Sequence, residues 1–265
     1  MIAPPSPFRV VTALVRGYAP RVLQVRGWVC AALFVLPVVI SYGIMALLRF
    51  KAPHFQGSHD EQMVLKLFHQ ILAQLAMPIL VLVAAPAGIR EDLEQRTLPL
   101  VLSRPVPVWM LPFSKGLLWF GWGAVWIIVA VTALLGLGLD TADLPLMILG
   151  LLLIYWAELG FMTFMGLIFK RGTLWGALVL LLWDPLVRIF PGRLQRFTFI
   201  HYLENIVGSR GSSGGVSQLL AQTQISTLWP IAALVLLLFG LLCWAAAGWK
   251  LHHTPIGLAG ADAEG

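Results

Sequence analysis

Charged side chains are scarce in this sequence, and cysteines are almost absent. Only 11% of the 265 residues are charged, whereas 59% are hydrophobic and the mean hydropathy is +0.85. A soluble globular domain carries about 25% charged residues, so the composition excludes that class. The cysteines, Cys30 and Cys243, fall in separate apolar runs, and the six histidines show no metal-site spacing. We therefore expect neither a disulfide nor a bound metal.

The sequence also lacks the motifs of common nucleotide-binding and hydrolytic sites. No G-x-x-x-x-G-K-[ST] run occurs, so this chain cannot cradle ATP phosphates itself. Asp184, His201 and nearby serines have no strained nucleophile turn beside them. We expect no catalytic residue and no cofactor bound by this chain. The formal charge of +6 is better explained by membrane topology than by a nucleic-acid partner.

Long apolar runs dominate the chain instead. A bilayer core about 30 Å thick needs roughly 20 apolar residues per helix, with every backbone group paired within the segment. Six continuous runs fit, although the fifth is short: 28–48, 67–89, 116–139, 145–169, 172–187 and 228–249. Their continuity disfavours an all-strand barrel. We predict an all-α integral membrane protein with six transmembrane helices, forming one domain over residues 1–265 with no room for a soluble catalytic domain.

A basic, partly apolar segment precedes the first run. It reads FRVVTALVRGYAPRVLQVRGW, and no small-residue cleavage site follows, so we expect it to be retained. Its composition favours an amphipathic helix lying in the membrane interface, and the alternative is a plain juxtamembrane tail. The segment between the fifth and sixth runs is also mixed, which favours short amphipathic helices on the outer leaflet over a simple loop.

Lysine and arginine predict the orientation. With the N-terminus inside, the inner segments hold eleven of these residues and the outer segments seven. We therefore expect both termini to be cytoplasmic.

A dense group of charges interrupts the apolar pattern between the second and third runs. Five of the seven residues from 90 to 96 are charged in the segment EDLEQRTLPLVLSRPVPVW. Pro99 disfavours helix at Leu98, so one helix should stop near Thr97 and a short one begin there with the Thr97 hydroxyl as a cap. Residues 105–112 are expected to be extended. The result is a small apolar knuckle that needs a partner to cover it.

These residues resemble the signature of the type-2 ATP-binding-cassette (ABC) permeases, especially the small six-span subunits similar to the nitrous-oxide-reductase maturation permease. The matching positions are Glu91, Glu94, Thr97, Leu98, Leu102, Ser103, Pro105 and Lys115. The sequence departs from the family at Arg96, Pro99 and Val108-Trp109, where glycine, a helix-favouring residue and a basic residue are usual.

The resemblance implies a permease subunit, an exporter of the cell (inner) membrane, that pairs with a second copy or close paralogue. A separate ABC ATPase subunit would bind ATP and Mg and supply hydrolysis, so this chain would not be an enzyme. The coupling helix that contacts the ATPase would comprise Glu91, Asp92, Glu94, Arg96, Thr97, Leu98, Leu100, Val101, Leu102 and Arg104. The alternative is an ATP-independent membrane scaffold or assembly factor.

Three polar residues within the apolar runs are candidates for a translocation path. Glu158 lies near the middle of the fourth run, where a carboxylate costs at least a few kcal/mol, and the alternative is a protonated or hydrogen-bonded packing residue. Gln74 and Tyr42 are weaker candidates of the same kind. Gly172 and Gly176 form a GxxxG that permits close helix approach, either within one subunit or between two.

Overall fold

The computed structural model describes most of the chain, and nearly all of the described residues are helical. These residues are 7–22, 24–51, 64, 67–84, 107, 109–137, 144–169, 171–187, 193–207 and 228–253. The named helices are α1 (Pro7–Val22), α2 (Val25–Lys51), the π-helical turn η1 (Leu72–Ala76), α4 (Met77–Ala84), α7 (Met110–Ala133), α8 (Leu144–Ile168), α9 (Gly172–Ala177), the π-helical segment η3 (Leu178–Trp183), α10 (Asp184–Val187), α11 (Phe199–Val207) and α13 (Trp229–His253). Two 3-10 turns, η2 (Leu134–Leu137) and η4 (Arg193–Phe197), complete the set.

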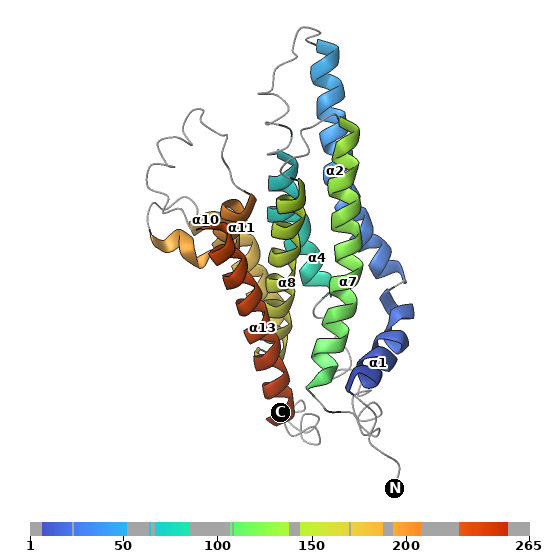
Figure 1. The fold of residues 1–265 in the computed structure, drawn as a ribbon, viewed down its shortest axis with the longest axis vertical. Helices are drawn as coiled ribbons and strands as arrows, with labels where there is room; N and C mark the ends of the chain where they lie inside the picture. Colours follow the sequence, from blue (N-terminus) through green and yellow to red (C-terminus); the bar gives the residue numbers. More distant parts are fainter. Residues whose placement is uncertain are drawn as a thin grey trace.

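Five helices are long and apolar enough to cross a bilayer. They are Arg26–Leu47, Leu67–Ala84, Met110–Ala133, Leu144–Ile168 and Trp229–His253. The expected fifth span, 172–187, is instead a shorter chain of α9, η3 and α10, with an apolar part over Gly172–Trp183. The long helices run side by side, and each of the first four runs opposite to the one before it, whereas α13 runs in the same direction as α8 (Figure 1). The fold is thus compatible with a multi-pass helical membrane protein.

Prolines account for several helix boundaries. Pro112, Pro145 and Pro230 each lie in the first turn of α7, α8 or α13, where proline removes no intrahelical hydrogen bond. Helix α7 therefore begins at Met110, although residues 105–112 were expected to be extended. Because Pro112 fits a first turn, Lys115 lies in the second turn of this helix rather than at its start.

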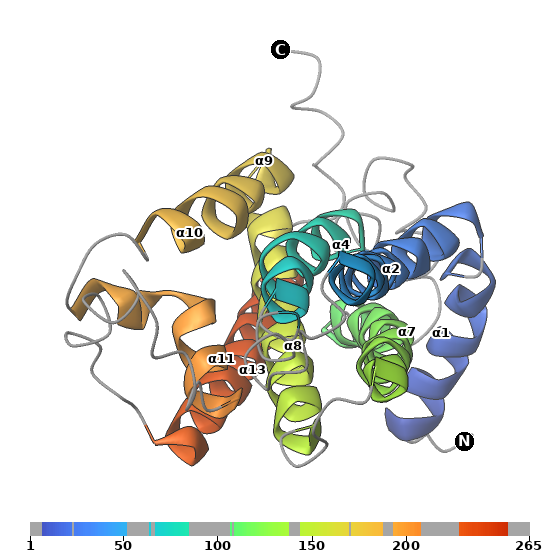
Figure 2. The same ribbon diagram turned by 90° about the horizontal axis from the view of Figure 1, so that it is seen from above.

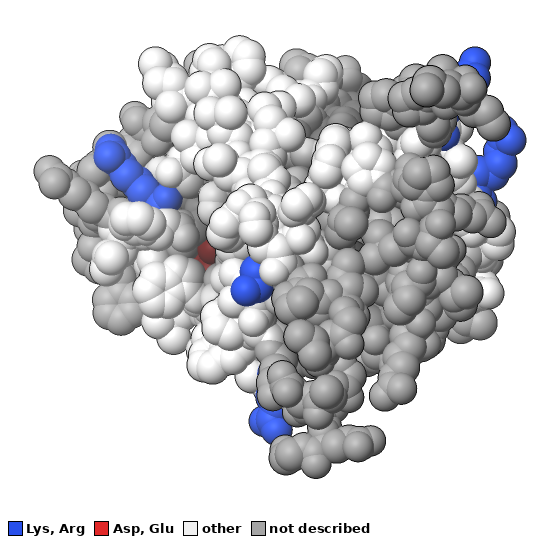
Figure 3. All heavy atoms as spheres, turned by 90° about the horizontal axis from the view of Figure 1, so that it is seen from below, with Lys and Arg blue, Asp and Glu red and all other residues white. Residues whose placement is uncertain are grey.

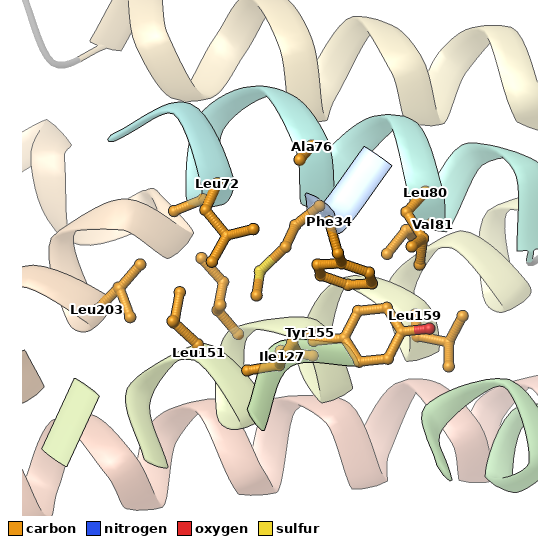
Figure 4. Close-up of a cluster of buried hydrophobic side chains, with 14 of the residues drawn as sticks. Phe34, Leu72, Ala76, Leu80, Val81, Ile127, Leu151, Tyr155, Leu159 and Leu203 are labelled. Carbon is orange, nitrogen blue, oxygen red and sulfur yellow. The ribbon is translucent and has the colours of Figure 1, made fainter. Parts of the chain in front are cut away.

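Helix α8 is the centre of the packing. It contacts α4, α7, α9, α11 and α13 (Figure 2). The core beside it takes Phe34 from α2, Leu80 from α4, Ile127 from α7, and Tyr155 and Leu159 from α8 (Figure 4). Side chains from most of the long helices therefore meet in one hydrophobic cluster.

Glycines admit aromatic rings between the helices. A Cβ on Gly123 would lie 2.5 Å from the Tyr155 ring, and one on Gly240 would lie 2.3 Å from the Trp156 ring. The Tyr155 hydroxyl also donates to the Trp119 backbone carbonyl at 2.9 Å. These contacts fix α8 against α7 and α13, because no other residue leaves room for the rings.

The GxxxG pair packs within the subunit. A Cβ on Gly172 would lie 2.3 Å from the Met165 carbonyl oxygen, and one on Gly176 would lie 2.0 Å from the Met162 sulfur. Both glycines therefore face α8 of the same chain. Of the two alternatives that the sequence leaves open, the structure shows the intrasubunit contact.

Candidate functional site

The predicted coupling residues lie outside the described residues. These are Glu91, Asp92, Glu94, Arg96, Thr97, Leu98, Leu100, Val101, Leu102 and Arg104. The helices that flank them are described: α4 ends at Ala84 and α7 begins at Met110. Helix α4 runs toward the end of the bundle where α1 lies, and α7 starts at that end (Figure 1). The two described helix ends that flank these residues therefore lie toward the end of the bundle where α1 and the last turns of α13 lie.

The start of α7 is buried between α1 and α13. The Lys115 ammonium nitrogen lies 4.3 Å from the centre of the Tyr18 ring on α1, and Lys115 is only 5% exposed. Such a desolvated cation–π contact contributes about 1 to 2 kcal/mol. On the other side, α13 approaches closely at Gly248: a Cβ added to this glycine would lie 3.2 Å from the Trp109 Cβ. We call this arrangement of Tyr18, Trp109, Lys115 and Gly248 the α7 seat.

Sequence reasoning identified Lys115 but missed its partner. Tyr18 was noted only as part of a basic amphipathic segment, and Trp109 only as an interfacial tryptophan. The available signal was an aromatic residue on a helix next to a membrane, together with a lysine at the start of a run. Which aromatic meets which cation depends on how α1 folds back on α7, and no local pattern encodes that.

Exposed cations gather at the α1 end. Among residues whose exposure the structure describes, Arg9, Arg16, Arg26, Arg171 and Lys250 are exposed at or next to this end, against Arg196 toward the other. Lys and Arg side chains appear at several places in the view from below, with acidic atoms visible only in a recess (Figure 3). Among the cations whose exposure is described, most of the exposed ones therefore lie at the α1 end.

Glu158 lies inside the subunit. Its side chain is 1% exposed, and its Oε2 atom has no hydrogen-bond partner among the described residues. The residue is therefore placed in packed protein, and contact with cargo would require the helices around it to separate.

Asp184 joins the end of the fifth helical segment to α11. Its Oδ1 and Oδ2 accept hydrogen bonds from the backbone N–H groups of Phe199 and Ile200, at 3.1 and 3.3 Å. These are orphan donors of the first turn of α11, so Asp184 caps that helix from another element. Within α11, burial lowers the pKa of His201 below its usual 6.5, and the charge of Arg196 adds to this effect.

The other two path candidates differ in placement. The Tyr42 hydroxyl donates to the Ala133 carbonyl at 2.5 Å and so ties α2 to the end of α7. Gln74 lies in η1, half-buried, and its Oε1 accepts a hydrogen bond from the Gln70 Nε2 at 3.5 Å. Glu158, Gln74 and Tyr42 thus come from three separate helices, and no hydrogen bond among the described residues links their side chains to one another.

The described residues contain no group of three or more His, Cys, Asp or Glu side chains that could hold a metal ion. No family model, no curated protein and no solved structure matches this chain. Residue-level argument is therefore the basis for the functional assignment that follows.

Proposed function

We propose that this chain is the permease subunit of an ABC exporter in the cell (inner) membrane. Two copies, or one copy and a close paralogue, pair in the bilayer. A separate ABC ATPase subunit binds ATP and Mg and drives the pair through the segment 90–104. Both termini are cytoplasmic, and 172–187 is a short fifth span.

The α7 seat is the observation that best supports this proposal. The segment 90–104 enters α7 a few residues before Trp109 and Lys115, which are held by α13 and α1 respectively. Movement of that segment would therefore act on three helices at once, because the start of α7 cannot shift without displacing the Tyr18 and Gly248 contacts. A mechanical input from a cytoplasmic partner needs such a rigid point of entry.

Charge supports the orientation. Cytoplasmic ends of membrane helices are enriched in Lys and Arg, and five exposed cations lie at or next to the α1 end. The end of α4 and the start of α7, which flank the segment 90–104 in the chain, also lie toward this end, so an ATPase bound there would be in the cytoplasm, where ATP is available.

The short fifth segment is compatible with a span. Its 16 residues, from Gly172 to Val187 (187 − 172 + 1), extend about 24 Å at 1.5 Å per residue. Local thinning of the bilayer accommodates such a deficit at a modest cost. Seven of its side chains are exposed and apolar, including Leu174, Leu182 and Leu186, which suits contact with lipid or a second copy.

Co-purification with the ATPase tests the proposal. The variant L98D/L100D/L102D places three charges on the predicted coupling helix and should weaken ATPase binding at least about 30-fold, because truncating a single interface hot spot already costs about 2 kcal/mol. The control L194D/F197D puts two aspartates on exposed apolar residues of η4 and should bind normally.

Full retention of the ATPase by the triple variant would contradict the coupling role. If the unmodified chain neither binds an ATPase nor stimulates ATP hydrolysis in liposomes, the ATP-independent scaffold would be the better assignment.

A further inference from the structure

Two glutamines lie on the outward side of a membrane-length helix. Residues 67–71 are helical and continue into η1, so Gln70 and Gln74 are one turn apart on the same helix. Gln70 is exposed and Gln74 half-buried, whereas Leu72, Ala73 and Ala76 point into the core. The hydrogen bond between the two amides is 3.5 Å long, at the limit for such a bond.

Gln74 lies at membrane depth, and Gln70 lies one turn nearer to the end of the span at Leu67. Gln74 is 7 residues from Leu67 (74 − 67) and 10 from Ala84 (84 − 74), the ends of the span. At 1.5 Å per residue these separations are about 10 and 15 Å, so Gln74 lies well inside a hydrocarbon core about 30 Å thick. Neighbouring Leu75 is 50% exposed, so the surface around the pair is apolar.

Lipid cannot satisfy these side chains. Each glutamine amide has two N–H donors and a carbonyl oxygen with two lone pairs, and one shared hydrogen bond uses only a fraction of them. An unpaired amide in an apolar medium costs several kcal/mol. The remaining hydrogen-bond donors and acceptors of Gln70 and Gln74 therefore point to a polar partner at the same depth.

A second copy of this chain supplies that partner. The glutamine side chain is both donor and acceptor, so two copies related by a two-fold axis can pair their amides in both directions. Amide side chains stabilise contacts between membrane helices in this way. The GxxxG pair, Gly172 and Gly176, is already occupied by α8 of the same subunit and is not available to a second copy.

We propose that two copies of this chain meet in the membrane through Gln70 and Gln74. The proposal deepens the proposed function, because it names where the permease pair is joined. It needs no ATPase, so its failure and the failure of the transport assignment are separable.

Cysteine cross-linking in native membranes tests the contact. The two natural cysteines, Cys30 and Cys243, are buried and are replaced by alanine. In this background, Q74C and Q70C are oxidised with copper phenanthroline and compared with L242C, which is 67% exposed on α13. We expect a covalent dimer for Q74C at several times the yield of L242C. A yield no greater than that of L242C at both glutamine positions would overturn the proposal.

A second measurement does not depend on cysteine chemistry. Dimer dissociation of Q70A/Q74A in detergent, followed by fluorescence energy transfer on dilution, is compared with L242A. Loss of the paired amides should raise the dissociation constant about threefold to fifteenfold. Q70N/Q74N keeps the amide groups and should recover part of the affinity. An unchanged dissociation constant for Q70A/Q74A would count against the contact whether or not the ATPase binds.

Discussion

The helix that contains η1 and the segment that contains η3 share one backbone defect in different surroundings. The turn η1 ends at Ala76 and Pro78 follows two residues later, and η3 ends at Trp183 with Pro185 at the same offset. Proline lacks an N–H and its ring clashes with the carbonyl four residues earlier. Opening the preceding turn into a π-helix relieves that clash without breaking the helix.

Burial separates the two elements. In α4 the buried residues are Met77, Pro78, Leu80, Val81 and Ala84. In the fifth segment the buried positions recur every four residues, at Gly172, Gly176, Leu180 and Asp184, and most of the others are exposed. The helix is thus buried on several sides next to η1, whereas the fifth segment is buried along a single face. Stability should therefore depend on the surroundings rather than on the π-helix itself.

The largest expected difference compares leucines in the two elements. Leu80 is 1% exposed and Leu182 is 58% exposed. Leu80→Ala should lower the free energy of unfolding by about 2 kcal/mol, the low end of the range for buried leucines, because packing is lost while the transfer from lipid contributes little. Leu182→Ala should change it by less than about 0.5 kcal/mol.

Thermal unfolding in matched detergent measures both leucine variants. Equal losses would show that the fifth segment is as tightly packed as α4, and the comparison would fail.

A smaller effect is expected at the hydrogen bonds between Asp184 of the fifth segment and the start of α11. Asp184→Asn leaves a single acceptor oxygen for the Phe199 and Ile200 N–H groups, so one of them loses its partner. The cost should be about 1 kcal/mol, typical of a lost helix cap. Hydrogen exchange at Phe199 and Ile200 should accelerate, while amides in α13 keep their protection. Unchanged exchange in α11 would mean that the cap does not hold this helix.

The smallest effect concerns pH. The pKa of His201 is lowered in the fold from 6.5, chiefly by burial and then by Arg196. Because the unfolded chain binds the proton more readily, the contribution of His201 to stability should be constant above pH 6.5 and fall as the pH drops below it. The midpoint of thermal unfolding is measured between pH 7.5 and 5.5 for the unmodified chain and for His201→Gln, and the unmodified chain should lose more stability on acidification. A loss no larger than that of the variant would contradict the prediction.

The sequence predicted the long helices well because their signal is local. Continuous apolar runs located all five membrane-length helices of the described residues. The start of α7 was misplaced, because Pro112 can either follow an extended segment or occupy a first turn. The fifth run was already recognisable as short, yet its π-helical form could not be read from Pro185 alone.

For the candidate functional residues, too, the sequence identified the residue types but not their contacts. Glu158, Gln74 and Tyr42 were detectable as polar residues in apolar runs, but their surroundings were not. Asp184 was noted only as the end of a short run, and its role as a cap for α11 comes from a contact 15 residues distant. Hydrogen-bond partners across that separation depend on how the helices turn back on one another.

Composition and apolar run length alone determined that this chain is helical and suited to a bilayer, because the lack of water in hydrocarbon forces each backbone group to pair within its own segment. Tertiary structure alone decided that Lys115 meets Tyr18, that Gly172 and Gly176 face α8, and that Gln70 and Gln74 face outward. The rotation of a helix about its axis is set by which neighbours fill its grooves. In a nearly uniform apolar sequence that choice leaves little trace in the order of residues.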